Sequence, residues 1–495
     1  MSKALLFMVD RPNAEKELFL APPFGLYRLK FFLESHGHHA DIVDPNIDEV
    51  NLERITHDLV GFTSYHETLE RDLDLAERVK QKYPDIPIVF GGIEARNNYR
   101  QILELSSADI IVLGEGEYPL LHILNQLDKK SLRPGSIDGL IVKATKGCQA
   151  TKPQQPLTKE EFAKVTLGMD FSKIPFDKYW ENTRRKYKEP NENEIRAIRL
   201  FTGSYCSVGC NFCSHAGDNN RHMCSEETLE LLVKVASQKP EVRTVIFDDD
   251  NYTLYAKEVA KTCELISQAK EDGYLPSELE FICMSRVTDV CTAQGYDMLR
   301  AMKKAGFRLI IYGVESFSDK VLQDIGKKTT VHQNEEAIRR TVSVGITPLL
   351  NLILFAPAID KDGLVATMDK SMQAIRQGAE VSINEYCWCW PGSFWYNDSS
   401  LDVVTETRTI STTGKTFTKK QYILPRDLSV RRLIQDSNDL YDDLHKMLQF
   451  DYGIQHFPKR LRALMRFYSL YQALGEQYER QKEELFEIMI QDGKN

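Results

Sequence analysis

The chain has 495 residues, with 63 Lys and Arg against 72 Asp and Glu and a formal net charge of -9. A length of this size predicts about three domains with well-buried cores. The acidic balance argues against a general nucleic-acid binder, which carries a basic stripe. Ten cysteines are too few for a disulfide scaffold, and three of them cluster between positions 206 and 213. This spacing indicates an intracellular metal site rather than a disulfide framework.

Neither of the most apolar runs predicts a targeting or membrane segment. The N-terminal run, residues 4–9, is too short for a signal peptide and ends at Asp10. The internal run, residues 349–359, is interrupted by Asn351 and Pro357. We therefore expect no membrane span and a soluble, cytoplasmic protein.

Residues 1–135 alternate short apolar runs with helical patterns. The predicted strands are 5–9, 40–43, 59–62, 86–90 and 110–113. Strands that alternate with helices predict an open, doubly wound parallel sheet of the Rossmann or flavodoxin type. Ligands of such sheets bind outside the carboxyl ends of the strands. The turns there, Thr63-Ser64, Gly91-Gly92 and 114–117, are small or glycine-rich and allow a ligand to approach the backbone.

Prolines punctuate residues 136–194, which we interpret as a linker. A second α/β series covers 195–400. Its predicted strands are 195–201, 244–247, 280–284, 309–312, 350–355 and 381–386. Six such strands predict a partial (β/α)6 barrel with its active site at the strand carboxyl ends. For residues 401–495 we expect a hairpin over 407–420, followed by a helical C-terminal domain.

Cys206, Cys210 and Cys213 form a C-x3-C-x2-C pattern after the first predicted barrel strand. Thiolates are soft ligands that suit zinc or iron–sulfur clusters. Three cysteines without a nearby fourth predict a cubane cluster with one iron left open. A structural zinc site is the alternative, since it needs a fourth ligand. The local rivals for that position are His215, His222 and Cys224.

With an aromatic residue before its last cysteine, this segment resembles the signature of the radical S-adenosylmethionine (radical SAM) superfamily. The resemblance implies that Cys206, Cys210 and Cys213 hold a [4Fe–4S] cluster. In that family the amino and carboxylate groups of SAM chelate the fourth iron. An electron from the cluster cleaves SAM to methionine and a 5′-deoxyadenosyl radical, which removes hydrogen from a substrate carbon.

Three later segments are similar to the same family: the acidic stretch 247–252, Ser285-Arg286-Val287, and 313–316 at the end of the fourth strand. The resemblance implies a set of SAM-binding residues, namely Phe212, Asp248, Asp249, Arg286, Glu315 and Ser316. Which of the three consecutive aspartates, 248–250, points inward stays open. The family's glycine after the fifth strand is missing from 354–358.

The first domain resembles the cobalamin-binding domain that precedes the barrel in many radical SAM proteins, through 22–26, 89–94 and 114–117. The resemblance covers residues 3–390. It implies a set of cobalamin-binding residues, namely Pro23, Gly25, Leu26, Thr63, Ser64, Gly91, Gly92, Gly114, Glu115 and Gly116. The Asp-x-His-x-x-Gly signature is absent, so no axial histidine is assigned. We expect His66 at the surface or at a helix start, with an approach to the cobalt face as the alternative.

The resemblance implies a cobalamin-dependent radical SAM methylase, in which one SAM supplies the methyl group and a second generates the radical. One alternative is a non-methylating radical reaction, such as cyclisation, ring contraction or C–C coupling. The other is a non-catalytic iron–sulfur or cobalamin-binding protein. A methylthiotransferase is disfavoured because no cysteine precedes Cys148. Expected partners are a small-molecule, lipid or peptide substrate and an external one-electron donor such as flavodoxin or ferredoxin. No catalytic residue is assigned.

The segment Cys387-Trp388-Cys389-Trp390 follows the sixth predicted strand. We expect a buried aromatic lid in which the thiols act as small hydrophobes. The alternative is that the segment lines the substrate pocket, or that one thiol serves as an acid or as a second metal ligand. The helices beyond residue 425 are expected to shape the substrate pocket.

Overall fold

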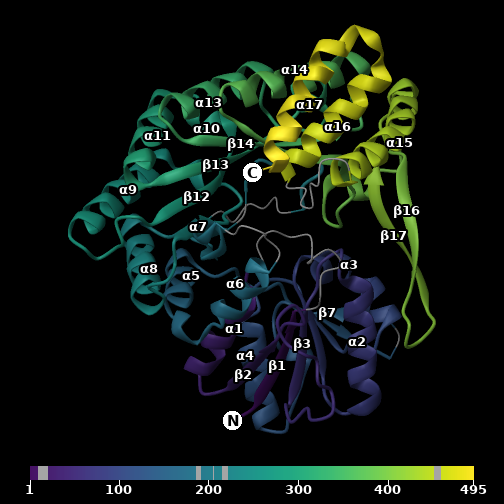
Figure 1. Ribbon diagram of the computed structural model, residues 1–495. Coiled ribbons are helices and arrows are strands. Elements are labelled where there is room, and N and C mark those ends of the chain that lie inside the picture. The colour runs from purple at the N-terminus through teal and green to yellow at the C-terminus, as the bar shows by residue number, and fades with distance from the viewer. Residues whose placement is uncertain are drawn as a thin grey trace.

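The computed structural model describes residues 1–8, 21–145, 147–185, 191–204, 206–214, 221–450 and 459–494. An N-terminal α/β domain lies below a second, larger α/β unit, and the C-terminal helices flank that unit (Figure 1). No helix among the described residues combines the length and apolar character that a membrane span requires.

The first sheet has seven strands in the order β2-β1-β3-β4-β5-β6-β7. The strands are β1 (Lys3–Met8), β2 (His39–Val43), β3 (Leu59–Thr63), β4 (Ile88–Gly91), β5 (Ile110–Val112), β6 (Leu140–Lys143) and β7 (Cys148–Ala150). The first five pair in parallel, which confirms the doubly wound sheet. β6 and β7 are antiparallel and lie within the segment expected to be a linker. Gly139, at φ 81°, precedes β6 and sits in a backbone conformation that favours glycine.

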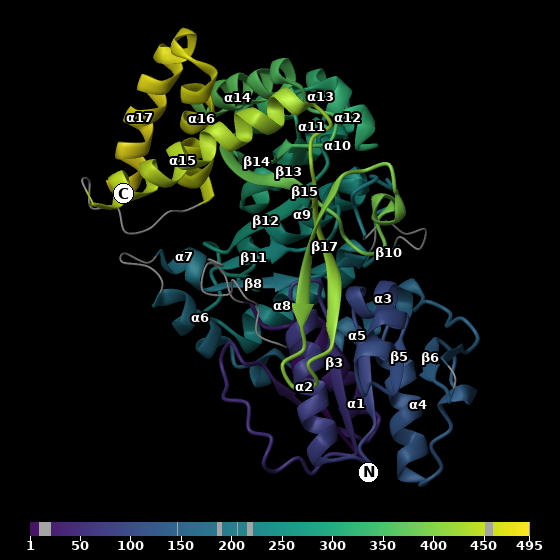
Figure 2. The ribbon, with the colours of Figure 1, turned by 90° about the vertical axis from the view of Figure 1, so that its right-hand side faces the viewer.

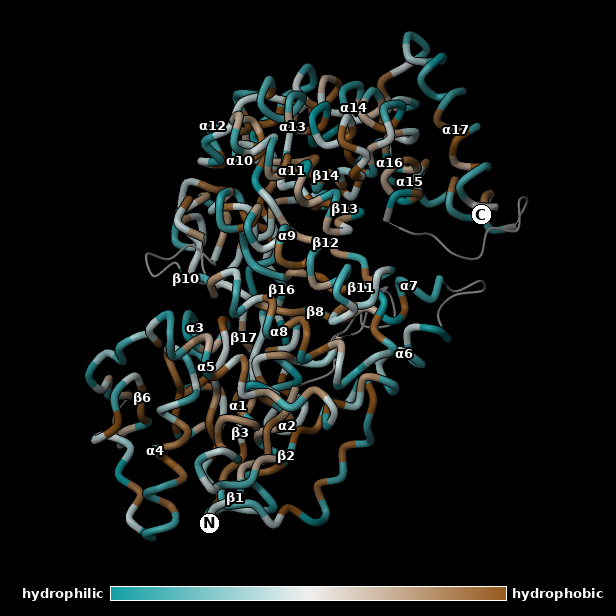
Figure 3. Tube along the Cα trace, turned by 90° about the vertical axis from the view of Figure 1, so that its left-hand side faces the viewer, coloured by the Kyte–Doolittle hydropathy of each residue, from teal (hydrophilic) through white to brown (hydrophobic). Residues whose placement is uncertain are grey.

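Helices cover both faces of this sheet. The helices are α1 (Phe24–Ser35), α2 (Leu69–Lys82), α3 (Ile93–Leu105) and α4 (Glu117–Asp128). One core layer joins α2 and α3 to strand residues such as Phe7 and Phe62. The other joins α1 and α4 to Leu6 and Leu59. Hydrophobic residues accordingly concentrate along β1 and β3 (Figure 3), because both faces of a doubly wound sheet are buried.

Between the two sheets the chain forms α5 (Lys159–Leu167), α6 (Phe176–Arg184) and α7 (Glu192–Ile195). Thr158 begins α5 with a capping box, in which its hydroxyl accepts from the backbone N–H of Glu161. The buried aromatic residues Phe162, Trp180 and Tyr179 attach these helices to the neighbouring units. The segment is therefore packed structure rather than an open connection.

The second sheet has eight strands in the order β16-β17-β15-β14-β13-β12-β11-β8. Its six parallel strands are β8 (Ala197–Leu200), β11 (Thr244–Phe247), β12 (Glu280–Ser285), β13 (Phe307–Glu315), β14 (Thr347–Phe355) and β15 (Glu380–Trp388). The helices between them are α8 (Ser225–Gln238), α9 (Ala256–Glu271), α10 (Val287–Val290), α11 (Ala293–Ala305), α12 (Asp319–Asp324), α13 (Val331–Ser343) and α14 (Lys361–Arg376). A short ribbon of β9 (Gly203–Ser204) and β10 (Arg221–His222) lies beside β8. The predicted partial (β/α)6 barrel is confirmed.

The hairpin expected over 407–420 consists of β16 (Val403–Thr409) and β17 (Thr416–Ile423). β17 pairs with β15, so the hairpin extends the barrel sheet instead of belonging to the helical unit. Its far end reaches the first domain beside α2 (Figures 1 and 2), where Ile410 and Phe417 join the core. There the backbone N–H of Thr412 donates to Asp74 at 2.8 Å.

Three helices close the chain: α15 (Leu428–Phe450), α16 (Lys459–Leu474) and α17 (Glu479–Lys494). α16 packs against β15, and the buried Arg466 on this helix pairs with Glu385 on that strand at 3.2 Å. The guanidinium of Arg466 also lies over the rings of Phe355 and Tyr441. The helical C-terminal unit therefore covers the barrel, as the sequence predicts.

Candidate active site

The three clustered cysteines lie on a loop that follows β8, and Asp249 holds the start of this loop. The Asp249 carboxylate, 1% exposed, accepts from the backbone N–H groups of Thr202 at 2.7 Å and Gly203 at 2.8 Å. It also accepts from the Thr202 hydroxyl at 2.6 Å. Asp249, predicted to bind SAM, thus directs its bonds to the cysteine loop.

The middle of the loop is tied to the segment after α12. The backbone N–H of Asn211 donates to the Ile325 carbonyl at 2.9 Å, and its side-chain amide donates to the Asp324 carbonyl at 2.8 Å. Lys328 Nζ donates to the Val208 carbonyl at 2.8 Å. These contacts place the thiols at the mouth of the barrel, next to the end of β13.

Cys206, Cys210 and Cys213 are all partly exposed. Burial raises the pKa of Cys210, with further contributions from the charges of Lys327, which lowers it, and of Glu315 and Cys206, which raise it. Cys206 and Cys210 therefore share one charged environment. In the described ranges no three His, Cys, Asp or Glu side chains are already arranged around a metal position. As a donor set, three cysteine thiols beside cationic side chains fit an iron–sulfur cluster, which is anionic and thiolate-bound.

Of the three rivals for the fourth ligand position, Cys224 and His222 have contacts of their own. His215 lies outside the described residues. Cys224 begins α8, where its backbone N–H donates to Glu227 at 2.7 Å. The ring of His222 packs edge-on against Tyr255, with the centroids 4.9 Å apart, and burial lowers the pKa of His222 to about 4.

Glu315 ends β13 beside a buried cation that the predicted site omits. Lys327 Nζ lies 2.7 Å from the Glu315 carboxylate, and both side chains are 10% exposed. Glu315 has φ 62°, an uncommon value for a non-glycine residue and one that clusters at functional sites. A Cβ at Gly313 would lie 2.5 Å from Lys327 Nζ, so the glycine makes room for the ammonium. The sequence signal that could have indicated this pair is Lys327 itself, a charged residue twelve positions after Glu315.

Arg286 begins α10 with part of its guanidinium unsatisfied. Its Nε is buried without a hydrogen-bond partner, and its Nη2 makes only a 3.4 Å contact with the Lys327 carbonyl. Guanidinium groups bind carboxylates through paired N–H donors. This orphaned donor beside Cys210 and Glu315 fits the carboxylate of SAM.

The other predicted SAM residues face elsewhere or contribute indirectly. The Ser316 hydroxyl, fully buried, contacts Thr367 on α14 at 3.1 Å. Asp248 pairs with Arg199 on β8 at 3.0 Å, whereas Asp249 binds the backbone of the cysteine loop. The sequence left open which of the consecutive aspartates points into the barrel, and these contacts assign that position to Asp248. Phe212 is partly buried and packs on the main core. Arg199 was missed, although a charged residue in an otherwise apolar strand could have indicated it.

The strand ends of the first domain present a glycine-lined edge. A Cβ at Gly25 or Gly91 would meet no atom within 4 Å, so both face open space. A Cβ at Gly92, φ 91°, would lie 2.9 Å from the Ser64 carbonyl and 3.1 Å from Thr63 Oγ1, so this position requires glycine. Gly91 ends β4 and Gly25 lies in the first turn of α1, and open glycines at these positions suit a broad, flat macrocycle such as a corrin.

Other predicted cobalamin residues have structural partners. The Ser64 hydroxyl donates to the buried Asp72 at 2.5 Å. The Pro23 carbonyl accepts from the N–H of Leu26 at 2.9 Å and starts α1. A Cβ at Gly114 would lie 3.1 Å from Gln154 Oε1, and both polar atoms of the Gln154 amide are buried without partners.

Glu115 connects the first domain to the barrel. Its carboxylate pairs with Arg221 on β10 and accepts the backbone N–H of Leu157 at 2.8 Å. Burial raises the pKa of Glu115, and the charge of Arg221 opposes this shift. The next residue, Gly116, leaves space for Leu29 on α1. The 114–117 turn is therefore an interdomain contact as well as a predicted cofactor contact.

His66 is buried rather than at the surface, and it lies close to a helix start, two residues before Thr68, which caps α2. Its Nδ1 lies 3.3 Å from Glu94, and its Nε2 lies 2.8 Å from the Lys420 carbonyl on β17. Its ring packs edge-on against Trp390, with centroids 5.4 Å apart. Both ring nitrogens have partners because the hairpin covers the residue, and sequence patterns near position 66 could not show that long-range contact.

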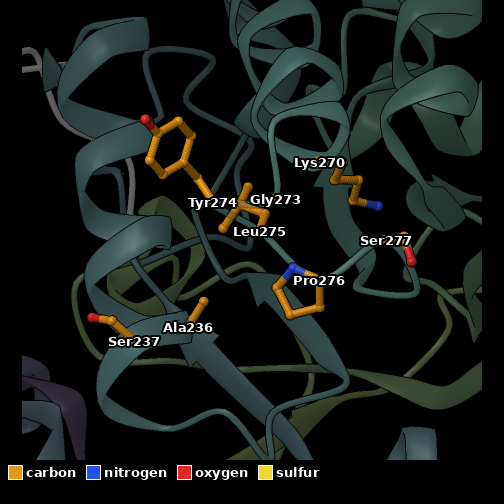
Figure 4. A pocket seen from close by; sticks show the side chains of 8 residues that line it. All are labelled: Ala236, Ser237, Lys270, Gly273, Tyr274, Leu275, Pro276 and Ser277. Carbon is orange, nitrogen blue, oxygen red and sulfur yellow. The ribbon is translucent and has the colours of Figure 1, made fainter.

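A shallow pocket lies between the ends of α8 and α9, far from these residues (Figure 4). Its lining residues are Ala236, Ser237, Lys270, Gly273, Tyr274, Leu275, Pro276 and Ser277. Those helices lead into β11 and β12, so the pocket is at the amino ends of the barrel strands. Active sites of such barrels lie at the opposite face.

Two family models match the chain. Residues 14–124 match the B12 binding domain, and residues 200–370 match the Radical SAM superfamily. Together with the cysteine loop at the mouth of a (β/α)6 barrel, these matches place the chain in the radical SAM superfamily. It is a radical SAM enzyme of the group that carries a B12-binding domain ahead of the barrel. Domains of these two kinds bind cobalamin and a [4Fe–4S] cluster with SAM, which are the predicted cofactors.

Three curated proteins are similar to this chain in sequence. An uncharacterized methyltransferase of Pyrococcus horikoshii is 23% identical over 379 residues, covering 74% of this chain and 77% of that protein. An anaerobic magnesium-protoporphyrin IX monomethyl ester cyclase of Rubrivivax gelatinosus is 27% identical over 346 residues, covering 66% and 57%. The hopanoid C-3 methylase of Methylococcus capsulatus is 23% identical over 394 residues, covering 76% and 68%.

Two solved structures show the same fold along nearly the whole chain. The cobalamin-dependent radical enzyme OxsB, with aqua-cobalamin and SAM bound, has a TM-score of 0.69 and 16% identity, covering 94% of this chain and 72% of that one. TsrM from Kitasatospora setae, with cobalamin and a [4Fe–4S] cluster bound, has a TM-score of 0.69 and 14% identity, covering 100% and 99%.

Proposed function

We propose that this enzyme is a cobalamin-dependent radical SAM methyltransferase that methylates an unactivated carbon of a small-molecule, lipid or peptide substrate. One observation carries the proposal: residues at the strand ends of the first sheet are in direct contact with residues at the mouth of the barrel. Arg221 binds Glu115 there, and Asn97 Nδ2 on α3 donates to the Pro391 carbonyl after β15 at 3.2 Å. A methyl donor and a radical generator have to meet at one substrate carbon, and this arrangement brings their two sites together.

The cofactors would supply a methyl group and a strong hydrogen-abstracting agent, with overall consumption of two SAM and two electrons for each methyl group. The products besides the methylated substrate are S-adenosylhomocysteine, methionine and 5′-deoxyadenosine. An external one-electron donor, such as flavodoxin or ferredoxin, would deliver the electrons one at a time.

The residues of the chain orient these groups. Cys206, Cys210 and Cys213 would bind three irons. Arg286 would pair with the SAM carboxylate through its unsatisfied N–H donors, and Glu315, held by Lys327, would accept hydrogen bonds from SAM. The packing of the barrel under the C-terminal helices would exclude water from the reacting carbon.

The first domain would hold cobalamin at the open glycines Gly25 and Gly91, next to Gly92 and Thr63. His66 would not serve as an axial ligand, because Glu94 and the Lys420 carbonyl already bind its two nitrogens.

The test uses two products of SAM as separate readouts, measured anaerobically with the reduced, cluster-loaded protein. Methyl donation releases S-adenosylhomocysteine, whereas radical cleavage releases 5′-deoxyadenosine. With bound cobalamin and no substrate, the proposal predicts up to one S-adenosylhomocysteine per cobalamin, and none without cobalamin. If 5′-deoxyadenosine forms but S-adenosylhomocysteine does not, the methyltransferase proposal fails.

A second candidate is a non-methylating radical reaction on the same scaffold, favoured by the similarity to proteins named as cyclases. The mass of the product separates the two functions, since a methylated product gains one methyl group and a cyclised product gains none. The same measurement with SAM that carries a deuterated methyl group shows whether this methyl reaches the product.

A further inference from the structure

The strand register identifies which side chains point into the barrel. An apolar cluster contributed by neighbouring strands marks the inner face, and its members are Ala197, Ile246, Ile282, Leu309, Ile311 and Leu349. Side chains alternate along a strand, so the next inward layer toward the mouth includes Arg199, Asp248 and Asn351. The 3.0 Å ion pair between Arg199 and Asp248 agrees with this assignment.

On β15 the same face ends in aromatic residues. Asn351 pairs with Ser382, and Phe355 pairs with Tyr386, so Ser382 and Tyr386 share the inward face. Trp388, two residues further, continues that face. Its side chain is 36% exposed, whereas Trp180 and Trp395 are 5% and 3% exposed. An open indole at the mouth of a barrel is unusual enough to require an explanation.

Trp388 belongs to a continuous aromatic wall. Its ring stacks with that of Trp390, with centroids 5.6 Å apart and planes inclined by 27°. Tyr422 on β17 meets Trp388 edge-on at 6.2 Å and stacks on Tyr386 at 4.2 Å. The expectation of a buried lid is confirmed for the two thiols, since Cys387 and Cys389 are only 1% and 0% exposed. It is wrong for Trp388, whose indole is open.

The wall lies between the two predicted cofactor sites. On the cluster side, the backbone N–H of Trp395 donates to the Asn211 carbonyl in the cysteine loop at 3.1 Å. On the cobalamin side, Trp390 contacts His66 of the first domain.

We propose that Trp388 and Trp390 form the substrate-binding wall of this site and that the substrate carries a planar, unsaturated ring system. Indole rings recognise other rings by offset stacking, with centroids about 4.5–7 Å apart. The polar inner layer below, with Arg199 and Asn351, binds polar substituents of the ring. This inference rests on the proposed function, because it takes the space between the two cofactor sites to be the substrate site.

The experiment measures binding of indole to the cluster- and cobalamin-loaded protein by equilibrium dialysis under anaerobic conditions. Cyclohexanol serves as a non-planar probe of similar size, and tetramethylammonium as a cationic probe. The test variant is W388L/W390L, and W388F/W390F keeps planar rings at both positions. F394L is the matched control, because Phe394 lies in the same segment and is 74% exposed.

We expect saturable indole binding to the wild type, F394L and W388F/W390F within about twofold of one another, and a loss of about tenfold in W388L/W390L. Cyclohexanol should bind at least tenfold more weakly than indole. The proposal is overturned if the wild type does not bind indole saturably, if W388L/W390L binds it as the wild type does, or if cyclohexanol or tetramethylammonium binds equally well.

Two further readouts keep the interpretation clear. Far-ultraviolet circular dichroism and iron content establish that W388L/W390L is folded and loaded. If this variant loses cobalamin while it still binds indole, the wall serves the corrin and the proposal is overturned. Release of S-adenosylhomocysteine is measured in the same preparations, so a failure of the proposed function appears there and not in indole binding.

Discussion

The ammonium of Lys327 lies 2.7 Å from the carboxylate of Glu315, in a buried pair above Gly313 at the barrel mouth. Lys327 retains its charge because the attraction of Glu315 raises its pKa against the opposing effect of burial. The same cation adjoins Cys210 and, through its backbone carbonyl, Arg286. One pair thus links the acid expected to contact SAM with the cluster loop and the expected carboxylate-binding arginine.

Loss of one partner of this pair should be costly. We predict that K327M lowers the free energy of unfolding by about 3–5 kcal/mol, because Glu315 remains buried without a counter-charge. The double variant E315Q/K327M should regain most of that stability but still cleave SAM poorly. Thermal unfolding and 5′-deoxyadenosine assays measure the two effects.

The exposed pair Lys320–Asp360 has the same 2.7 Å separation and serves as the control. K320M should change stability by less than about 0.5 kcal/mol, because exposed ion pairs contribute little. Equal destabilisation by K327M and K320M would show that burial of the Glu315 pair has no energetic role.

Asp249 is predicted to be a positioning residue for the cysteine loop. D249A leaves the buried N–H groups of Thr202 and Gly203 unpaired, which should cost about 1–3 kcal/mol. We expect the variant to retain less iron and sulfide after anaerobic reconstitution, whereas D250N, altered at the exposed neighbour, should load fully. Normal cluster content in D249A would contradict this role.

The contact between Glu115 and Arg221 should couple the two domains. R221M removes the cation that contacts Glu115 most closely and leaves only Arg28, 4.0 Å away. We therefore predict faster cleavage by protease in the segment after residue 150 and weaker cobalamin retention on gel filtration. E115Q/R221M should restore protease resistance more than cobalamin retention. Unchanged proteolysis and retention in R221M would show that the pair does not couple the domains.

His66 should make no bond to cobalt. We predict that the electron paramagnetic resonance spectrum of the cob(II)alamin-loaded protein is the same with ¹⁴N- and ¹⁵N-labelled histidine. A change of the hyperfine pattern on labelling would mean that a histidine coordinates the metal and that the hydrogen bonds of His66 break on binding.

The sequence predicts the architecture well where a local pattern determines it. The five parallel strands of the first sheet and the six of the barrel follow from hydrophobic runs that alternate with helices. The cysteine loop follows from C-x3-C-x2-C spacing. β6 and β7 are missed because they are short antiparallel edge strands whose pairing depends on Gly139.

Contacts between distant segments account for the remaining differences. The burial of His66 depends on Lys420, 354 residues away, and the partner of Glu115 is Arg221, 106 residues away. No local pattern encodes such pairs. The roles of consecutive aspartates were likewise open, because the backbone after β11 turns Asp248 inward and Asp249 toward the loop.

The most direct test of the account is the amount of 5′-deoxyadenosine that the reduced, anaerobically reconstituted protein forms from SAM. We predict that the wild type, with one [4Fe–4S] cluster per chain, forms it, and that replacement of Cys206, Cys210 and Cys213 by alanine abolishes both the cluster absorption and the product. A wild-type protein that carries the cluster but leaves SAM intact, or a triple variant that still cleaves it, would contradict the assignment of a radical SAM active site to this loop.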